Sequence, residues 1–383
     1  MKNSIYVILL AIFLTAGCSV KQTDTADPVT RMIVSQRGQD SILVIDLDVI
    51  PQIRSIKIPL TTALVTWTNL NVDIHPWGNV AYVTQLQTKT YIMNLTSGTE
   101  LAAGTITDKD ILKPLKSGTY LVAARNGYSR ISSYSTLAPN PACSLVLTDR
   151  RINDLAVCDD NTTILVANES TQSSTDNPNY YVTELNIDRS GYITNPGHEI
   201  KQTEAVHQVS CAAGSKAGVA MAINPEKLIS FTIDQTTGLS RVEAEDATTN
   251  ASADVNAYIP QAIVFSPDGT ELFARLSSGG KQPPRGWIEK FTFDPATGAI
   301  TPVVGWVAEA PHTLAEFENA RLTMSLDGTV IYVPDTDNSK IDVIKTSDGS
   351  QATAITDQLI TSPTQISLGR VASYDQYWQG YIF

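Results

Sequence analysis

The sequence predicts an all-β fold, a seven-bladed β-propeller of four-stranded antiparallel blades, and two observations support this prediction. A unit of strand, tight turn and strand recurs along the chain at intervals that would hold four short strands. The chain also ends in a single strand without a blade of its own, and it begins with three strands that lack a fourth. Repeats of about 40–50 residues, each with four strands, are typical of this architecture.

The recurring unit is clearest in Ile263–Ala274, IVFSPDGTELFA, and in Leu322–Val333, LTMSLDGTVIYV. Asp-Gly suits the turn because both residues tolerate a positive φ at low cost. Weaker copies align on the residue before the turn. The seven aligned residues are His75, Leu115, Cys158, Cys211, Ser266, Ser325 and Ser367, at successive spacings of 40, 43, 53, 55, 59 and 42 residues. A solenoid, the main alternative, would need a more uniform period and capping repeats.

The two ends of the chain predict how the ring closes. A C-terminal strand completes a blade begun by three N-terminal strands, and this removes the free sheet edges. The four predicted strands are Thr364–Leu368, Arg31–Ser35, Ser41–Leu47 and Gln52–Ile58. The propeller is therefore expected over residues 31–370. The aromatic segment 371–383, with Tyr377, Trp378 and Tyr381, is expected to pack on it.

The N-terminus has the layout of a secretory signal peptide over residues 1–17. Lys2 precedes the apolar run Ile5–Ala16, which is too short to span a bilayer. Leu14-Thr15-Ala16-Gly17-Cys18 resembles the lipobox of bacterial lipoproteins, which implies that Cys18 is lipidated and becomes the mature N-terminus. Residues 18–30 are then a flexible tether. An ordinary signal peptide with an incidental cysteine is the alternative.

The lipobox resemblance also implies a location. The membrane would be the first partner, through the lipid on Cys18, and the protein would lie in the bacterial cell envelope. Ser19 resembles the sorting pattern that sends Gram-negative lipoproteins to the outer membrane, with either periplasmic or surface exposure.

Composition narrows the class of partner. The formal charge is −12, and it becomes −13 once residues 1–17 are removed, because Lys2 is their only charged residue. With no basic run, nucleic-acid binding is excluded, since phosphate contacts need clustered Lys and Arg. No pair of the four histidines has metal-ligand spacing, so we expect no metal and no cofactor. In the Asp335–Asn338 loop a turn is preferred over a Ca²⁺ site.

Three cysteines remain after Cys18. Cys158 and Cys211 take equivalent places on the innermost strands of adjacent blades, and an oxidising compartment would allow them to form a disulfide. Cys143 would then be the free thiol. The alternative is that the two strands lie beyond the Cα separation of about 7 Å that a disulfide tolerates, which would leave three free thiols.

The second and third strands of the repeat carry a family resemblance. Ile331–Gly349, Ala81–Thr84 with Tyr91–Gly98, and Asp294–Gly298 look like the repeat of the YVTN and lactonase-like seven-bladed propellers. The resemblance covers roughly residues 31–370. It implies the architecture and leaves the activity open, because one fold hosts many functions.

The catalytic-looking pattern of that family is only partly present. Lactonase-like propellers often carry His-Pro-His-like pairs about five residues before the Ser-Pro-Asp-Gly turn, where this chain reads Tyr258–Gln261 and Phe317–Ala320. His207 comes near that place in a third blade but is offset by one. Ser266 lacks a Gly-x-Ser-x-Gly elbow, so we expect it to be a turn residue. A hydrolase would have to use His207 or His312 with acids such as Glu316 or Asp254.

The first functional hypothesis is a binding or assembly module for a protein, glycan or envelope component. The long segments 60–70, 169–179, 247–259, 277–286 and 309–319 should gather on the face opposite the turns at 267–269 and 326–328. The expected binding residues on that face are Trp67, Tyr258, Arg285, Trp287 and His312. The second hypothesis is a lactonase-like hydrolase that acts on a small lactone or ester.

Overall fold

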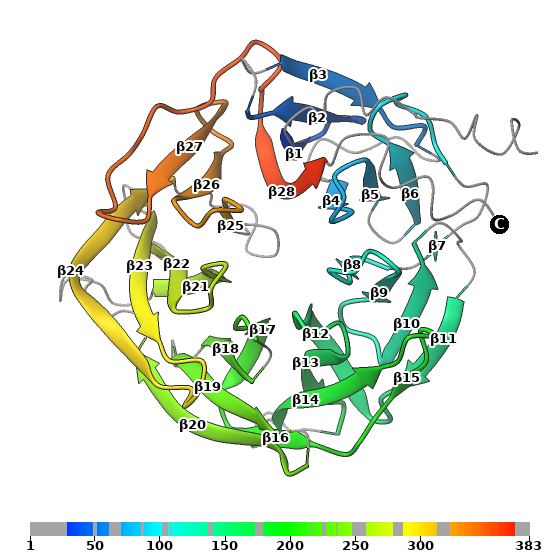
Figure 1. Ribbon diagram of the computed structural model, residues 1–383, viewed down its shortest axis with the longest axis vertical. Helices are drawn as coiled ribbons and strands as arrows, with labels where there is room; N and C mark the ends of the chain where they lie inside the picture. The colour runs from blue at the N-terminus through cyan, green and yellow to red at the C-terminus, as the bar shows by residue number, and fades with distance from the viewer. Residues whose placement is uncertain are drawn as a thin grey trace, which may run out of the picture. The chain divides into compact units, whose positions relative to one another are not determined.

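The structure, a computed structural model, describes residues 29–48, 52–60, 70–85, 88–101, 106–107, 109–136, 141–172, 179–214, 216–223, 227–234, 236–246, 258–278, 286–311 and 322–371. These residues form seven antiparallel β-sheets that stand as blades around a common centre (Figure 1). The prediction of a seven-bladed all-β propeller is confirmed. Within the described ranges the chain has no helix long and apolar enough to cross a membrane.

The strands follow one another along the chain from the centre of the ring outwards. Blade 1 contains β4 (Leu70–Ile74), β5 (Val80–Gln85), β6 (Lys89–Asn94) and β7 (Ile106–Thr107). Blade 2 contains β8 (Ile111–Pro114), β9 (Tyr120–Ala124), β10 (Arg130–Ser135) and β11 (Pro141–Val146). Blade 3 contains β12 (Arg150–Val157), β13 (Thr163–Ser170), β14 (Tyr180–Ile187), β15 (Ile193–Thr194) and β16 (Glu199–Gln202).

The remaining blades have the same order. Blade 4 contains β17 (Ala205–Cys211), β18 (Ala217–Ile223), β19 (Lys227–Asp234) and β20 (Gly238–Asp246). Blade 5 contains β21 (Tyr258–Phe265), β22 (Glu271–Ser278), β23 (Gly286–Phe293) and β24 (Ile300–Ala310). Blade 6 contains β25 (Thr323–Met324), β26 (Val330–Asp335) and β27 (Lys340–Lys345). The closing blade contains β28 (Pro363–Val371), β1 (Val29–Gln36), β2 (Ser41–Asp46) and β3 (Gln52–Lys57).

Two blades depart from a simple four-stranded sheet. In blade 3 the outer edge of β14 pairs with β15 at one end and with β16 at the other. In blade 6 three strands form the sheet, and single bridges from Ile355 to Ile341 and from Gln351 to Ile344 occupy the fourth place. Every blade thus covers the outer edge of its third strand.

The closing blade joins the two ends of the chain as predicted. β28 pairs with β1 in antiparallel register from Val29 opposite Val371 to Gln36 opposite Pro363. The pairing extends beyond the predicted 31–370 by two residues at the start and one at the end. Val371 therefore belongs to the strand, and the rest of the aromatic segment, 372–383, lies outside the described residues.

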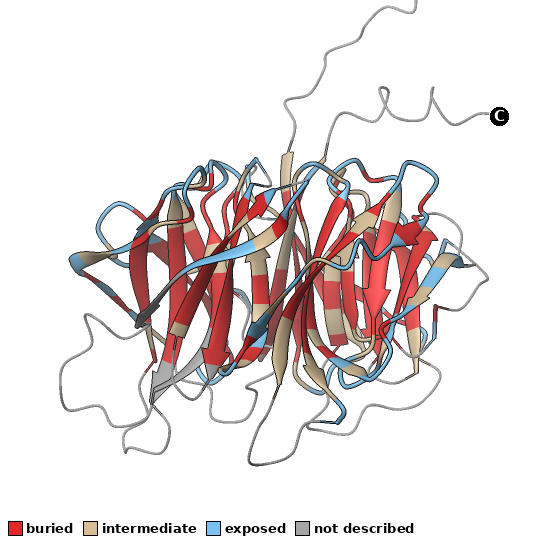
Figure 2. Ribbon diagram, turned by 90° about the horizontal axis from the view of Figure 1, so that it is seen from below, coloured by how far each residue is buried: buried red, intermediate tan, exposed pale blue. Residues whose placement is uncertain are grey.

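The core consists of seven separate hydrophobic clusters, one between each pair of neighbouring blades. Alternation along a strand sends successive side chains to opposite faces of the sheet, so each blade packs against both neighbours. On β13, for example, Val166 packs toward blade 2, whereas Leu165 packs toward blade 4. Figure 2 shows buried residues along the middle of the blades and exposed residues at their rims. Each interface depends on two blades, so the ring is stable only when closed.

The turn between the first and second strands has the predicted chemistry. Ser266 Oγ donates to Asp268 Oδ1 at 2.6 Å and accepts the Glu271 N–H at 2.9 Å. Ser325 and Asp327 repeat the hydroxyl–carboxylate bond at 2.6 Å. Hydrogen bonding by the serine hydroxyl is the largest cause that lowers the pKa of Asp268. Because the Ser266 hydroxyl is committed to its own turn, Ser266 is a turn residue.

The two faces of the ring differ in their connections. Pairing of Tyr258 with Ser278, and of Gly286 with both Ser277 and Ala310, places these blade 5 strand ends on one face. Because neighbouring strands in every blade are antiparallel, the strand ends next to all five long segments lie on this same face. It is hereafter called the long-loop face. The turns at 267–269 and 326–328 lie on the opposite face, hereafter the short-turn face, as predicted.

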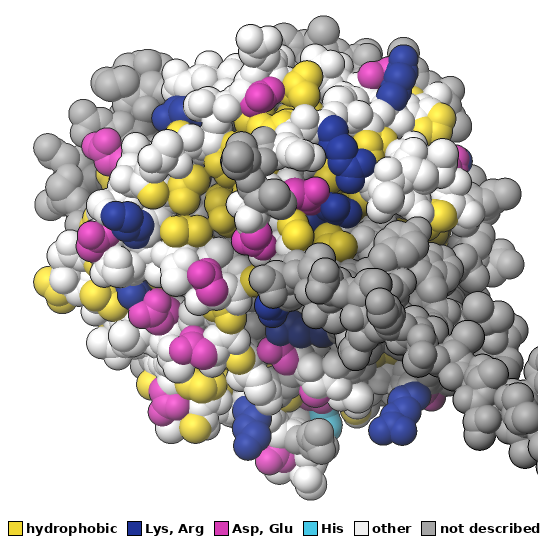
Figure 3. Space-filling model, turned by 45° about the horizontal axis from the view of Figure 1, so that its top comes forward, with side chains coloured by type: hydrophobic (Ala, Val, Ile, Leu, Met, Phe, Trp, Pro, Cys, Tyr) yellow, Lys and Arg dark blue, Asp and Glu magenta, His cyan; other side chains and the backbone are white. Residues whose placement is uncertain are grey.

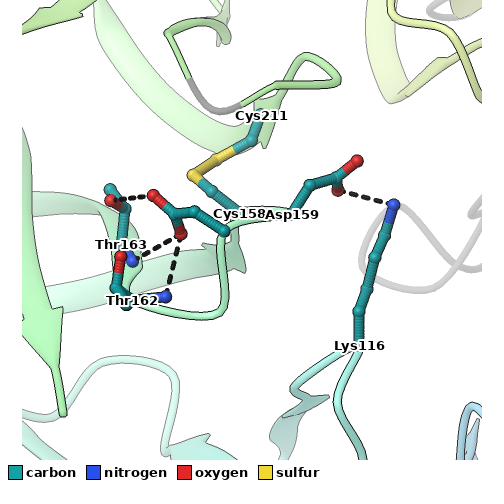
Figure 4. The surroundings of a disulfide bond; sticks show 7 residues. Lys116, Cys158, Asp159, Thr162, Thr163 and Cys211 are labelled. Carbon is teal, nitrogen blue, oxygen red and sulfur yellow. Dashed lines mark hydrogen bonds and ion pairs between the residues drawn. A yellow bond between two sulfur atoms is a disulfide. The ribbon is translucent and has the colours of Figure 1, made fainter.

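A disulfide joins Cys158 and Cys211 near the short-turn face, with their Cα atoms 5.3 Å apart (Figure 4). The sequence left this pairing open against three free thiols; the structure contains the bond, and Cys143 is the free cysteine. In Figure 4 the Lys116–Asp159 ion pair, at 2.6 Å, lies beside the disulfide. It connects the turn of blade 2 to the turn of blade 3, as the disulfide connects blades 3 and 4.

Candidate functional site

The centre of the ring is lined by the innermost strands, and four of these carry a bulge at the same place. The register shifts at Asn153 in β12, at His207 in β17, at Gln261 in β21 and at Thr364 in β28. A bulge inserts one extra residue and redirects its side chain. All four bulges lie toward the long-loop end of their strands, so this end of the channel is the candidate site.

The bulges correct two details of the repeat alignment. In the closing blade Gly369, not Ser367, lies five residues after the bulge residue Thr364. Ala212, not Cys211, takes the place before the turn in blade 4, because its N–H bonds to Ala217 O at 3.0 Å. Ser266 does the same with Glu271 O at 2.8 Å. His207 is therefore five residues before the turn in blade 4, as Gln261 is in blade 5. The offset of one that the sequence suggested for His207 is wrong.

Polar side chains of the innermost strands accept hydrogen bonds from the backbone of the next blade. Gln365 Oε1 accepts the Val72 N–H at 2.9 Å, and Gln208 Oε1 accepts the Ile263 N–H at 2.9 Å. Asp154 Oδ2 accepts the Val209 N–H at 3.3 Å. These three contacts are equivalent by position in the repeat. These hydrogen bonds hold neighbouring innermost strands in register, so the three side chains have a structural role.

Asp110 is the acidic group at the channel mouth. It directly precedes β8, and its Oδ1 accepts the Asn126 N–H at 2.7 Å. Burial raises the pKa of Asp110, and the hydrogen bond from Asn126 opposes the shift in part. A cavity of about 10 Å³, large enough for one water molecule, lies between β28, β4 and β8. Its lining residues are Asn71, Val72, Asp73, Asp110, Leu112 and Gln365.

His207 is the imidazole at the same mouth. It is exposed, on β17, whereas Val206 before it is fully buried. The amide of Asn153, the bulge residue of blade 3, donates to Val206 O at 2.9 Å. Asn126 in turn donates from its side chain to Asn153 O at 3.0 Å. A chain of hydrogen bonds therefore runs along the rim from Asp110 to the strand that carries His207.

Arg275 on β22 is a feature that the sequence analysis missed. Its side chain is fully buried between blades 5 and 6, where Nη2 donates to Pro311 O at 2.8 Å. Its Nε and Nη1 have no hydrogen-bond partner among the described residues. Burial lowers the pKa of Arg275 to about 10, although Asp335 acts in the opposite direction, so the guanidinium stays charged at neutral pH. In sequence, a buried arginine in a strand of alternating polar and apolar residues looks like a solvent-facing one. The hydrophobic pattern therefore could not reveal Arg275.

The predicted binding residues are only partly placed. Trp67, Arg285 and His312 lie outside the described residues, as do Asp254 and Glu316 of the alternative hydrolase. Tyr258 is the first residue of β21 and pairs with Ser278 on the long-loop face. Trp287 is half-buried and packs against the core between blades 4 and 5. Its replacement would therefore also disturb the core.

The remaining candidates have structural roles. His75 is 4% exposed in the turn after β4, and its Nε2 lies 2.9 Å from Gly118 O of blade 2. Its Nδ1 accepts the Trp77 N–H at 3.2 Å, and burial lowers the pKa of His75. Asp335 accepts the Asn338 N–H at 3.1 Å, which is the turn the sequence favoured. Within the described ranges no three His, Cys, Asp or Glu side chains are grouped to hold a metal ion.

Charged side chains of both signs lie on the surface. On the side of the molecule seen in Figure 3, acidic and basic side chains are interspersed among uncharged and hydrophobic ones. Several basic groups are also paired, as in the Arg31–Asp46 bridge at 2.6 Å and the Lys290–Glu271 bridge at 2.6 Å. This agrees with the net charge of −12.

The fold and this channel define the class of protein: a closed seven-bladed β-propeller with a polar channel mouth. No protein-family model matches the chain, and no curated protein matches it. Among solved structures it is similar to a functionally unknown protein from Desulfotomaculum acetoxidans, with a TM-score of 0.66 and 13% identity over 88% of this chain and 98% of the other.

Two further similar structures come from proteins described as lactonases. One is a candidate 6-phosphogluconolactonase from Bacteroides fragilis, with a TM-score of 0.63 and 13% identity over 91% of this chain and 99% of the other. The second is the periplasmic gluconolactonase of Pseudomonas aeruginosa, with a TM-score of 0.59 and 13% identity over 90% of this chain and 99% of the other. At these identities the similarity establishes a fold shared with lactonase-like propellers.

Proposed function

We propose that the protein is a lactonase-like hydrolase that opens a lactone or similar ester at the long-loop mouth of its channel. The place of His207 carries this proposal. It is exposed at the channel mouth, five residues before the turn, on the rim that also holds Asp110. The similarity in fold to structures described as gluconolactonases supports the same choice.

The reaction needs two proton transfers, and the rim offers groups for both. His207 takes a proton from water as the water oxygen bonds to the carbonyl carbon. The ring C–O bond then breaks, and the departing alkoxide takes a proton to give a hydroxy acid. Asp110, whose pKa is raised by burial, holds a proton more readily than an ordinary carboxyl and is suited to donate to an oxygen of the substrate.

Replacing His207 tests the hydrolase directly. We expect the wild type to hydrolyse members of a panel of γ- and δ-lactones, followed by acid release in weakly buffered solution. His207→Ala should lower kcat/KM by about 10²-fold or more, because general-base catalysis is worth about that much. Its thermal unfolding should be unchanged, since the side chain is exposed.

His312→Ala is the matched comparison, because His312 is the other histidine that the sequence offers as a base. Full activity in His207→Ala with loss in His312→Ala would refute the role of His207. Absence of lactone hydrolysis by the wild type across the panel would refute the hydrolase itself.

A binding or assembly module is the second candidate, and the arrangement of the faces favours it. The strand ends next to all five long segments lie on the long-loop face. Loops on a rigid scaffold are the usual seat of binding. Capture of an envelope component at this face, without turnover of any ester, is what this candidate predicts.

The proposal includes a lipid anchor at Cys18, in the cell envelope. The propeller begins at Val29, which pairs with Val371 on the short-turn face. Residues 19–28 can extend over about 35 Å at most. The anchor would therefore bring the short-turn face toward the membrane and leave the channel mouth open on the far side.

Cys18→Ser tests the anchor. We expect the variant to leave the membrane fraction and appear in the soluble fraction with unchanged melting, since lipid is the only proposed attachment. Wild type and variant should be compared by fractionation after a high-salt wash. A variant that still sediments with membranes would contradict the lipid anchor.

A further inference from the structure

The turn between β9 and β10, Arg125–Tyr128, reaches from blade 2 to the innermost strand of blade 3. Gly127 N donates to Ile152 O at 2.8 Å, and Ile152 N donates to Tyr128 O at 2.9 Å. Gly127 adopts φ +76°, where a glycine is favoured. Asn126 binds both Asp110 and Asn153, as described above. The turn is thus fixed to two innermost strands at the channel mouth.

This turn presents an aromatic ring to solvent. Tyr128 is 52% exposed, although it lies beside a rim on which polar side chains predominate. The Arg125 guanidinium lies 4.0 Å from the centroid of the Tyr128 ring. A cation over a ring is an attractive arrangement, and here it favours one orientation of the Tyr128 side chain. The ring is therefore preorganised and accessible.

A second arginine–tyrosine pair nearby serves as a comparison, because its ring is covered. Arg150 lies 3.4 Å from the centroid of the Tyr181 ring, at the start of β12 and β14. Its Nη2 also forms a bridge of 3.1 Å to Glu199, and Tyr181 is only partly exposed. That pair is neutralised and covered by its own blade. Tyr128 retains more than half of its surface for a ligand.

The chemistry around Tyr128 defines the ligand class. An exposed aromatic ring stacks on a flat face of C–H groups, and the exposed Asn126 and partly exposed Arg125 offer hydrogen bonds beside it. A net charge of −12 disfavours an anionic ligand. We infer that Tyr128, with Arg125 and Asn126, forms a stacking subsite for a neutral ring that carries hydroxyl groups, such as a pyranose. The inference names a ligand class for the proposed mouth site, but it requires binding only.

The test uses methyl β-D-glucopyranoside, with open-chain sorbitol as a comparison, and measures binding by saturation-transfer difference NMR. We expect the wild type to bind the pyranoside and to bind sorbitol more weakly, because sorbitol has no rigid C–H face. Tyr128→Ala should weaken pyranoside binding about fivefold to tenfold, the usual range for loss of one aromatic contact. Tyr128→Phe should keep most of the affinity, because the ring is retained.

Tyr192→Ala is the matched control. Tyr192 is 57% exposed in the turn between β14 and β15, on the short-turn face, so its loss should leave binding unchanged. Equal binding by wild type and Tyr128→Ala, equal binding of sorbitol and pyranoside, or no saturation transfer to the pyranoside would each overturn the subsite.

The outcome separates this inference from the proposed hydrolase. His207→Ala should bind the pyranoside as well as the wild type does. Pyranoside binding that depends on Tyr128, without lactone hydrolysis, would overturn the hydrolase and support the subsite. Lactone hydrolysis without pyranoside binding would overturn the subsite and support the hydrolase.

Discussion

Deleting residues 362–383 should abolish the cooperative unfolding of the propeller and cause aggregation. The deletion removes β28, which pairs with β1 along its whole length and whose Gln365 side chain accepts the Val72 N–H. It also removes Ile366 from the core between blade 6 and the closing blade. β1 then exposes an unpaired edge, and the neighbouring blades expose apolar surface to solvent. Circular dichroism melts and size-exclusion chromatography measure the effect.

A shorter deletion, of residues 372–383, is the control. It leaves β28 intact, so the ring should still close and unfold cooperatively. If the aromatic segment packs on the propeller, as its composition predicts, the melting temperature should fall by a few degrees at most. A chain without residues 362–383 that melts like the wild type would contradict the closed seven-bladed ring.

Removing the disulfide should lower the free energy of unfolding by about 4 kcal/mol. The bond joins residues 53 positions apart and thereby restricts the unfolded chain. It also ties the innermost strands of blades 3 and 4, where Ala156 and Cys211 pack against one core cluster. Urea unfolding of the Cys158→Ala, Cys211→Ala double variant should show a lower midpoint than the wild type.

Cys143→Ala provides the control for this experiment, because Cys143 is the free and only partly buried thiol. Its urea midpoint should stay close to that of the wild type. A reducing agent should shift the wild type toward the double variant and leave the double variant unchanged. Three titratable thiols in the denatured, unreduced chain without Cys18 would show that the bond does not form.

The repeat made most of the fold predictable. Asp-Gly turns and alternating strands are local signals, so Ser266, Ser325 and the closing strands were placed within a few residues of their observed positions. The error at Cys211 arose because Gly214 follows it by three residues, the spacing that separates Ser266 from Gly269 in the true repeat. Only the backbone hydrogen bond of Ala212 fixed the register there, and with it the place of His207.

The candidate site was less predictable, because it depends on residues far apart in the sequence. The sequence offered exposed aromatics in long segments, and several of those residues lie outside the described ranges. The structure points instead to a short turn, where Tyr128 and Asn126 lie against β12, and to Asp110 before β8. Short turns give no composition signal for function, since their residues are also those of ordinary turns.

The sequence by itself determined the number of blades, the closure and the class of turn, because each follows from short-range pattern repeated seven times. Tertiary structure decided which polar side chains bond to the next blade and which are exposed at the channel mouth. In sequence, Gln208 and Asp154 look as suitable as His207 for a functional site. In the structure both accept a hydrogen bond from the next blade, whereas His207 is exposed at the channel mouth. The difference depends on a bulge and on the neighbouring blade, and pairing between blades is not encoded in either strand alone.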